Sequence, residues 1–383
     1  MRIALLTVDN REFGQKSETP QFGSAVAALL EGFDSLPEVN VDVLSCVRNR
    51  SFRTCMIGSR IQYHPIYVSS QGWLRSAYLG CSLKVRRALK ALEPDIIHAQ
   101  GTERWCAVAG AFPARAPRVL TIHGNIRLIN KITPLMPRSY WRVQELLERI
   151  CISRFDAVTC LSHYTKRHLS ARSGELPVIP NAVESRFFSI NPAPTSPLRI
   201  LFIANIQERK NQVAWINAIK PLFARFPFEV HFFGVAPQDD AYVQSFHECL
   251  HSHSNLIYRG AATRDTIESE LTKAAIVVLP SLEENCPMAV LEASAAGIPV
   301  ITSDCSGSKE LIQDRENGLL CNPKDAGSMR QALSTLLEDP QLRAKLARNS
   351  RHHAEKTHAP RIVAKQHLDL YENLTAKRSG THR

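Results

Sequence analysis

The chain of 383 residues contains no Cys-x-x-Cys pair, although ten cysteines are scattered along it. A zinc ribbon and a dithiol redox site both need closely spaced thiolates, so neither is expected. So low a density of cysteine also excludes a disulfide-stapled miniprotein and is typical of reduced thiols in a cytosol. We therefore expect a cytoplasmic protein.

Long apolar runs are also absent. No segment approaches the ~20 apolar residues that a membrane-crossing helix needs. The N-terminus is apolar only over residues 3–8 and has no small-residue cleavage site after it, so we expect a buried strand there rather than a signal peptide. With 44% hydrophobic and 22% charged residues, the composition is that of a globular protein of about two domains.

Basic residues are concentrated in the first half of the chain. Residues 1–190 contain 25 lysines and arginines against 15 acidic residues, and the remainder contains 22 against 21, within a net charge of +11. A basic half predicts either an anionic partner or a solvated basic face, and charge alone leaves both open.

Short apolar runs alternate with stretches of helical period along the whole chain. The predicted strands span residues 3–8, 41–46, 96–99, 119–122, 157–161, 198–204, 229–233, 256–259, 276–279 and 300–302. The predicted helices span residues 25–36, 82–92, 140–153, 212–225, 240–251 and 328–337. Strands that are apolar on both faces, with helices between them, predict an α/β fold with doubly wound parallel sheets.

Residues 191–197 contain three prolines, which do not fit inside a helix or a central strand. We interpret this segment as a linker between a first domain, residues 1–190, and a second domain, residues 191–360. Ligands of doubly wound sheets bind at the carboxyl ends of strands. We therefore expect an active site in a cleft between the two sheets.

The most informative segment lies between residues 277 and 304. A predicted strand ends at Pro280, a loop contains Glu284, and an alanine-rich helix begins near Pro287. The free N–H groups of such a helix start suit a diphosphate, and carboxylates nearby suit the hydroxyls of a sugar or ribose. Alternatively, Glu284 only complements the helix dipole and Glu292 only faces solvent.

The pattern Glu284-x7-Glu292, followed by Ala-x-Ala-x-Gly-x-Pro-Val, resembles the nucleotide-sugar signature of retaining glycosyltransferases of family 4. Further matching segments begin at Pro94, Leu120, Val178, Leu201 and Lys309, so the resemblance covers most of the chain. It implies GT-B architecture, in which two Rossmann-like domains face each other. The last helix, within residues 361–383, would return to the first domain and end in a loose basic tail from residue 377.

The resemblance also implies roles for three catalytic residues. Glu284 would bind hydroxyls of the donor sugar, Lys210 would neutralise the departing diphosphate, and His123 would face the donor sugar and the acceptor. The donor-binding residues that it implies are Glu292 for the ribose, together with Arg209, Asn205, Met288, Ala289, Val290, Leu291, Asn181 and Gly23. Without the resemblance, His123 would be a core or capping residue and Lys210 a surface charge.

The chain departs from the family pattern at several positions. Ala204 and Asn205 stand where the family has Gly and Arg, so one diphosphate cation is missing and Arg209 is the nearest substitute. Pro287 removes one N–H donor, and the N-terminal glycine-rich loop is reduced to Gly23.

No Asp-x-Asp motif occurs in the sequence, so we expect neither a bound metal nor another cofactor. The expected reaction is transfer of a sugar from a nucleoside diphosphate to an acceptor hydroxyl with retention, the leaving phosphate taking the proton. The expected acceptor is a glycan, lipid-linked or a polysaccharide precursor, reached from the cytosolic face of a membrane.

Two basic segments of the first domain suit an anionic membrane surface. They are residues 84–90 and residues 127–142, the second interleaved with Ile129, Leu135, Met136, Tyr140 and Trp141. A solvated basic face is the alternative.

Two other functions are less well supported. A GT-B epimerase is disfavoured because the Glu-x7-Glu segment is of the transferase type. A non-catalytic or decayed protein that binds nucleotide or an anionic polymer stays open, but no nucleic-acid-binding motif occurs, so no nucleic acid partner is expected.

Overall fold

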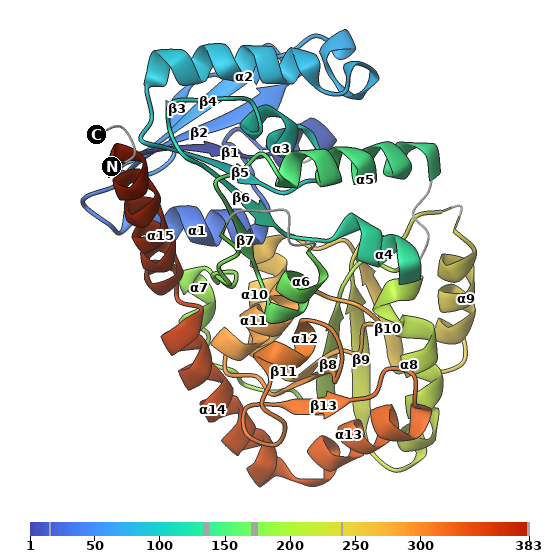
Figure 1. Cartoon of the computed structure of the whole chain (residues 1–383). Coiled ribbons are helices and arrows are strands. Elements are labelled where there is room, and N and C mark those ends of the chain that lie inside the picture. Colours follow the sequence, from blue (N-terminus) through green and yellow to red (C-terminus); the bar gives the residue numbers. More distant parts are fainter. Residues whose placement is uncertain (15–16, 133–137, 170–174, 239, 381–383) are drawn as a thin grey trace. The chain divides into compact units, whose positions relative to one another are not determined.

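The computed structural model describes residues 1–14, 17–132, 138–169, 175–238 and 240–380. It divides into a first unit, Met1–Ala182 with Pro360–Arg383, and a second unit, Val183–Ala359. Each unit has its own sheet with helices around it (Figure 1).

The first unit contains β1 (Arg2–Leu6), η1 (Asn10–Phe13), α1 (Ser24–Asp34), β2 (Asn40–Val47), β3 (Cys55–Met56), β4 (Ile61–Tyr67), η2 (Ser70–Gly72), η3 (Leu74–Ser76), α2 (Leu79–Leu92), β5 (Ile96–Gln100), α3 (Trp105–Gly110), β6 (Arg118–Ile122), α4 (Ile126–Ile132), α5 (Arg138–Ile152), β7 (Ala157–Cys160), α6 (His163–His168) and α15 (Pro360–Gly380). Its strand order is β3-β4-β2-β1-β5-β6-β7, and β3 is the antiparallel strand of this otherwise parallel sheet. The order reverses at β1, which lies between β2 and β5.

Both faces of this sheet are covered, because successive side chains of a strand point to opposite faces. Ile3 and Leu5 pack with residues of α1 and α15 in one apolar cluster. Ala4 and Leu6 pack with residues of α2, α3 and α5 in a second cluster. This explains why β1 is apolar at consecutive positions.

The C-terminal helix α15 lies beside α1 (Figure 1). A Cβ atom on Gly32 would lie 2.2 Å from the carbonyl oxygen of Pro360 and 2.8 Å from Cβ of Ala364. A glycine is therefore required where the two helices meet, since a side chain would overlap backbone atoms.

The second unit contains α7 (Ser185–Phe188), β8 (Leu198–Ile203), η4 (Glu208–Lys210), α8 (Gln212–Ile219), η5 (Lys220–Ala224), β9 (Phe228–Phe233), α9 (Ala241–Leu250), β10 (Leu256–Gly260), α10 (Arg264–Lys273), β11 (Ala274–Leu279), α11 (Met288–Ala295), β12 (Val300–Ser303), α12 (Ser308–Leu311), β13 (Leu319–Cys321), α13 (Ala326–Glu338) and α14 (Pro340–Thr357). Its six strands are parallel in the order β10-β9-β8-β11-β12-β13. Here the order reverses between β8 and β11.

The boundary between the units differs from the predicted one. The first unit ends at Ala182, so the proline-rich segment of residues 191–197 lies inside the second unit. There the N–H groups of Ala193 and Thr195 donate to the carbonyl oxygens of Thr272 and Lys273. Proline prevents helix and central strand, but it leaves neighbouring N–H groups able to hold an extended segment against the unit.

The chain's end also differs from the predicted loose tail. The helix α15 continues through residue 380, and Lys377 forms an ion pair with Glu175. Residues 381–383 lie outside the described residues. Within the described part of the chain, no helix combines the length and the apolar character that crossing a membrane requires.

Candidate active site

The reversal of strand order in the second unit brings two loops together. β8 and β11 are hydrogen-bonded neighbours, so the segments that follow them leave the sheet at the same edge. The segment after β8 contains Arg209 and Lys210 in η4, and the segment after β11 contains Glu284. Such a switch point is where doubly wound sheets bind ligands.

Lys210 and Glu284, which lie 74 residues apart in the sequence, form an ion pair at this edge. Glu284 is buried and Lys210 is half-buried, with 10% and 15% of their side-chain surfaces exposed. Arg209 Nη1 lies 3.4 Å from Glu284 Oε2 and donates a hydrogen bond of 2.6 Å to the carbonyl oxygen of Glu283. The structure therefore brings three predicted site residues into one cluster of two cations around a carboxylate.

Burial and charge act in opposite directions on these carboxylates. Burial alone would raise the pKa of Glu284, but Lys210 and Arg209 more than offset it and leave that pKa below its usual value. Burial raises the pKa of the neighbouring Glu283 to about 7, opposed by Arg209. The cluster thus keeps Glu284 ionised at neutral pH.

The loop that contains Glu284 is held by the segment after β12. The N–H of Glu284 donates to Oγ of Ser306 at 3.1 Å, and the N–H of Gly307 donates to the carbonyl oxygen of Glu284 at 2.8 Å. A Cβ on Gly307 would lie 1.8 Å from the carbonyl oxygen of Asn285. Glycine is therefore required at residue 307 to position Glu284.

The helix α11 begins at Met288, with Pro287 as its N-cap. In an α-helix the first N–H groups have no intrahelical acceptor, so those of Met288, Ala289 and Val290 are available for an anion. Leu291 differs from the prediction, because its N–H donates to the carbonyl oxygen of Pro287 at 3.3 Å. The N–H of Leu291 therefore takes part in the hydrogen bonding of the helix and is not one of the free N–H groups at its start.

Glu292 is buried on α11 rather than facing solvent. Burial, with the charge of Glu184, raises its pKa to about 7, and Arg264 opposes this. Arg264 Nη1 also lies 3.2 Å from Glu184 Oε1. Glu292 therefore changes its charge near neutral pH.

Asn205 follows β8, and its side chain forms a hydrogen bond with the segment that follows the neighbouring strand β9. Its Oδ1 accepts a hydrogen bond of 3.0 Å from the N–H of Val235, which follows β9. A Cβ on Gly234 would lie 2.1 Å from the carbonyl oxygen of Ala204. The position that the family fills with arginine is thus occupied by a short residue in a structural role.

In the first unit, a cavity of about 230 Å³ lies where the strand order reverses at β1. His123 and Gly23 line it, as do Asn10, Gln100 and Glu103. The Nε2 atom of His123 lies 2.8 Å from Oε1 of Gln100, and burial lowers the pKa of His123 to about 4. The ring is therefore neutral at pH 7.

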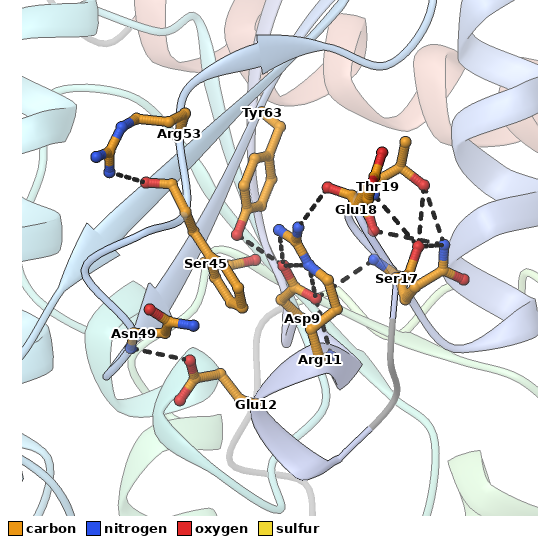
Figure 2. A network of polar contacts seen from close by, with 12 residues as sticks. Asp9, Arg11, Glu12, Ser17, Glu18, Thr19, Ser45, Asn49, Arg53 and Tyr63 are labelled. Atoms are coloured by element: carbon orange, nitrogen blue, oxygen red, sulfur yellow. Dashed lines mark hydrogen bonds and ion pairs between the residues drawn. The ribbon is translucent and has the colours of Figure 1, made fainter.

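A network of polar contacts surrounds Asp9, near Gly23 (Figure 2). Asp9 accepts hydrogen bonds of 2.7 Å from Arg11 Nη2 and from the hydroxyl of Tyr63. Its Oδ1 accepts from the N–H of Gln21 at 3.3 Å, and the carbonyl oxygen of Gln21 accepts from the N–H of Asn10 at 2.6 Å. These contacts hold Asn10 and Gln21, the latter two residues before Gly23, beside each other.

Asn181, the remaining predicted site residue, is buried next to the last residue of the first unit. Among the described residues, no group of three or more His, Cys, Asp or Glu side chains is arranged to hold a metal ion. Leu135 and Met136 of the predicted membrane-facing segment lie outside the described residues.

Several residues of these sites are missing from the sequence-based prediction. Gln100 and Glu103 line the same cavity as His123, and Arg264 acts on Glu292. Gln100 comes directly after the predicted strand of residues 96–99, and the structure extends that strand to include it. Its position two residues after His98, on the same face of the strand, is the one signal that indicates it. Arg264 had no signal, since it comes from a helix distant in sequence.

Family comparisons agree with this geometry. Residues 183–353 match the family Glycosyl transferases group 1, and residues 25–187 match Glycosyltransferase Family 4.

Two curated relatives share parts of this sequence. An N,N'-diacetylbacillosaminyl-diphospho-undecaprenol alpha-1,3-N-acetylgalactosaminyltransferase from Campylobacter jejuni is 38% identical over 117 residues, 30% of this chain and 30% of that protein. An exopolysaccharide phosphotransferase from Streptomyces coelicolor is 27% identical over 311 residues, 79% of this chain and 31% of that protein. The chain thus matches less than a third of the length of either relative.

Solved structures show the fold. Sucrose-phosphate synthase from Thermosynechococcus elongatus superposes with a TM-score of 0.80 at 16% identity, covering 98% of this chain and 99% of that one. HepE from Anabaena, solved in complex with UDP and glucose, superposes with a TM-score of 0.70 at 19% identity, covering 97% and 100%. The predicted α/β fold is confirmed. The chain belongs to the group 1 glycosyltransferases, its first half matches Glycosyltransferase Family 4, and its fold is GT-B.

Proposed function

We propose that this chain transfers a sugar from a nucleoside diphosphate sugar to an acceptor hydroxyl, with retention and without a metal ion. The proposal rests on one observation above all, the cluster of Lys210, Arg209 and Glu284 at the switch point of the second sheet. Cations there can neutralise a diphosphate, and an ionised carboxylate beside them can accept hydrogen bonds from sugar hydroxyls.

The remaining donor residues complete the binding site in this proposal. The N–H groups of Met288, Ala289 and Val290 bind the diphosphate at the positive end of α11. Glu292, when ionised, binds the ribose hydroxyls. HepE, whose structure contains UDP and glucose, supports a nucleoside diphosphate as the donor's carrier.

The chemical step breaks the bond between the anomeric carbon and the diphosphate oxygen, and it forms a bond from the acceptor oxygen to the same face of that carbon. The leaving phosphate takes the proton of the acceptor hydroxyl. Lys210, Arg209 and the first turn of α11 meet the charge that develops on the diphosphate, so no step needs a metal ion or another cofactor.

The acceptor in this proposal is a glycan, lipid-linked or a polysaccharide precursor, and it binds at the cavity lined by His123, Gln100 and Glu103. Polar side chains around a cavity of this size suit the hydroxyls of a sugar. The name of the relative from Campylobacter jejuni, which contains diphospho-undecaprenol, supports a lipid-linked acceptor.

Helix α5 adds support for a membrane surface as a partner. Val143, Leu146 and Ile150 are 42%, 55% and 48% exposed, and their spacing places them on one helix face. Arg142 and Arg149 are exposed on the same helix. Apolar side chains flanked by arginines suit an anionic lipid surface, so we propose a peripheral location at the cytosolic face.

A second candidate function is nucleotide binding without catalysis. It is favoured by Asn205, whose Oδ1 holds Val235 at a position where the family has an arginine. The loss of that cation would cost a few kcal/mol of transition-state stabilisation unless Arg209 replaces it.

Thermal unfolding with a panel of nucleoside diphosphates and their sugar conjugates, in the presence of EDTA, tests the donor site. A ligand at a hundred times its dissociation constant should add about 2.7 kcal/mol to the free energy of unfolding. We expect one nucleotide to stabilise the chain and Lys210→Ala and Glu292→Ala to abolish the shift. No shift with any nucleotide would contradict the proposal. A shift without sugar transfer to any glycan or lipid-linked acceptor would favour the second candidate.

A further inference from the structure

Three cations of the first unit lie over two aromatic rings. Cζ of Arg48 lies 4.1 Å from the centre of the Trp73 ring. Cζ of Arg50 and Nζ of Lys84 lie 4.4 Å and 5.3 Å from the centre of the Tyr67 ring. Lys84 Nζ also donates a hydrogen bond of 2.8 Å to the carbonyl oxygen of Tyr67. We call Arg48, Arg50 and Lys84 the stacked cations.

The stacked cations are exposed and have no acidic partner. Among the side chains that the structure describes, no carboxylate forms an ion pair with any of the three. The carboxylate of Glu12 instead accepts hydrogen bonds of 3.0 Å and 3.2 Å from the backbone N–H groups of Arg48 and Asn49 (Figure 2), so it holds the backbone of this loop. An aromatic ring fixes a cation without neutralising it, and the N–H edge of a stacked guanidinium stays open to an anion.

The stacked cations lie at the same edge of the first sheet as the proposed acceptor cavity. Val47 and Tyr67 are paired at the ends of the parallel strands β2 and β4, so Arg48 and Tyr67 lie at the carboxyl edge, where ligands of such sheets bind. The short helix η1 contacts both places, because Asn10 at its start lines the cavity and Glu12 holds the backbone of Arg48. An acceptor whose sugar lies in the cavity therefore has these cations next to it.

Exposed apolar side chains accompany the stacked cations. Leu79 and Leu83 are 48% and 54% exposed and lie one turn apart on α2, so they share a helix face. The start of this helix packs against η2, since a Cβ on Gly80 would lie 2.4 Å from Cα of Gly72, and Trp73 directly follows η2. The surface thus combines open cations with an apolar stripe, which suits a phosphate joined to a hydrocarbon chain.

We propose that the stacked cations bind the diphosphate that joins the acceptor sugar to a lipid. Guanidinium groups match pairs of phosphate oxygens in geometry and charge, and Leu79 and Leu83 offer apolar contact to the hydrocarbon chain. The acceptor is then a sugar linked to a lipid diphosphate, rather than a neutral glycan or a soluble polysaccharide. This inference rests on the proposed function, since it needs the acceptor sugar in the cavity that His123 lines.

Isothermal titration of the full chain with farnesyl diphosphate tests the site. The nucleoside diphosphate that stabilises the chain is present throughout, so that the diphosphate of the probe does not bind at Lys210. We expect farnesyl diphosphate to bind, farnesol not to bind, and the double variant Arg48→Gln/Arg50→Gln to bind farnesyl diphosphate at least about tenfold more weakly. High salt should weaken the binding to the wild type, because the cations are exposed.

Arg115→Gln is the matched control. Arg115 is also exposed in the first unit, but it precedes β6 and lies at the amino edge of the sheet, so this variant should bind the probe as the wild type does. Equal affinities of the double variant and the wild type would overturn the inference. So would inorganic diphosphate that binds as tightly as farnesyl diphosphate, because the site would then hold a free ion.

Kinetics supply a second readout. The KM of an acceptor linked to a lipid diphosphate should rise about tenfold in the double variant, with kcat and the KM of the donor little changed, because the stacked cations hold the acceptor away from the reacting atoms. An unchanged KM, or a rise only for a soluble acidic polysaccharide, would overturn the inference and leave the proposed function standing. Weakened binding of farnesyl diphosphate by the double variant, in a chain that transfers no sugar, would instead refute the proposed function and leave the diphosphate site standing.

Discussion

Lys210 and Glu284 form an ion pair that has little access to water, since only 15% and 10% of their side-chain surfaces are exposed. Removing one charge of a buried pair typically costs about 3–5 kcal/mol, whereas removing both can be nearly neutral. Because Arg209 also lies 3.4 Å from Glu284, we expect Lys210→Met to lower the free energy of unfolding by about 3 kcal/mol, at the lower end of that range. Urea unfolding measures this loss.

The double variant Lys210→Met/Glu284→Gln should recover most of that stability and still transfer no sugar. This outcome separates a role in catalysis from a role in folding. Lys273→Met is the control, since Lys273 pairs with Glu270 at 3.2 Å but is 43% exposed, and such pairs contribute little. A double variant that is less stable than both single variants would contradict the coupling of the pair.

Glu292 predicts a pH dependence of donor binding. Its pKa is raised to about 7, so the side chain is mostly neutral at pH 6 and mostly ionised at pH 8. Only the carboxylate accepts hydrogen bonds strongly from ribose hydroxyls. The affinity for a nucleoside diphosphate sugar, whose diphosphate loses no proton in this range, should therefore rise about tenfold from pH 6 to pH 8.

Isothermal titration at a series of pH values measures this rise, with Glu292→Gln as the comparison. The variant should bind the donor with an affinity that is independent of pH. The raised pKa also destabilises the folded chain as the pH rises from the unfolded value of 4.5 to about 7, and Glu292→Gln should remove that loss. A wild-type affinity that falls with rising pH would refute this role of Glu292.

At the scale of elements, the site depends on the close approach of two loops of the second unit. A Cβ on Gly307 would lie 1.8 Å from the carbonyl oxygen of Asn285, so Gly307→Ala must displace the loop that contains Glu284. We expect a loss of stability of about 1–3 kcal/mol and a loss of donor affinity of about tenfold or more. Calorimetric unfolding and donor titration measure the two effects.

Gly327→Ala is the control for this substitution. Gly327 lies in the first turn of α13, and its added Cβ would meet only the carboxylate of Asp325, with Oδ1 at 3.2 Å. Alanine favours a helix over glycine, so this variant should unfold at the same or a higher temperature and bind the donor normally. Equal losses in both variants would show that the approach of the two loops is unimportant.

At the scale of the whole molecule, the uneven charge predicts association with anionic membranes. The net charge of +11 is concentrated in residues 1–190, and helix α5 of that half exposes Leu146 and Ile150. Vesicles containing phosphatidylserine should bind the full chain, and the binding should weaken as salt is raised because surface charges are screened. Vesicle sedimentation measures this association.

Leu146→Glu should reduce sedimentation with these vesicles, since it places a like charge at an anionic surface. Met56→Glu is the matched control, because Met56 is also exposed in the first unit, at 57%, but belongs to the short strand β3. Equal binding by both variants and the wild type would exclude α5 as the contacting element.

Each of the ten predicted strands corresponds to an observed strand whose ends differ from the predicted ends by at most two residues. Their apolar runs are long enough to be buried on both faces of a sheet. The strands β3, β4 and β13 are missing from the prediction. β4 contains His64 and Pro65, which interrupt its apolar pattern, and β3 and β13 span only Cys55–Met56 and Leu319–Cys321. Short or interrupted strands acquire their pairing from neighbours rather than from their own sequence.

Local sequence was enough to indicate alternating strands and helices, a parallel sheet in each half, and the Glu284-x7-Glu292 segment, since each depends on residues close together in the chain. No local pattern contains the order of the strands or the packing of the last helix. These place Lys210 next to Glu284, 74 residues away in the sequence, and Tyr371 next to His98, 273 residues away. Packing likewise decided that the first unit ends at Ala182 and that Gly307 must lack a side chain. These features depend on which surfaces meet once the chain has folded, and that is a property of the tertiary structure alone.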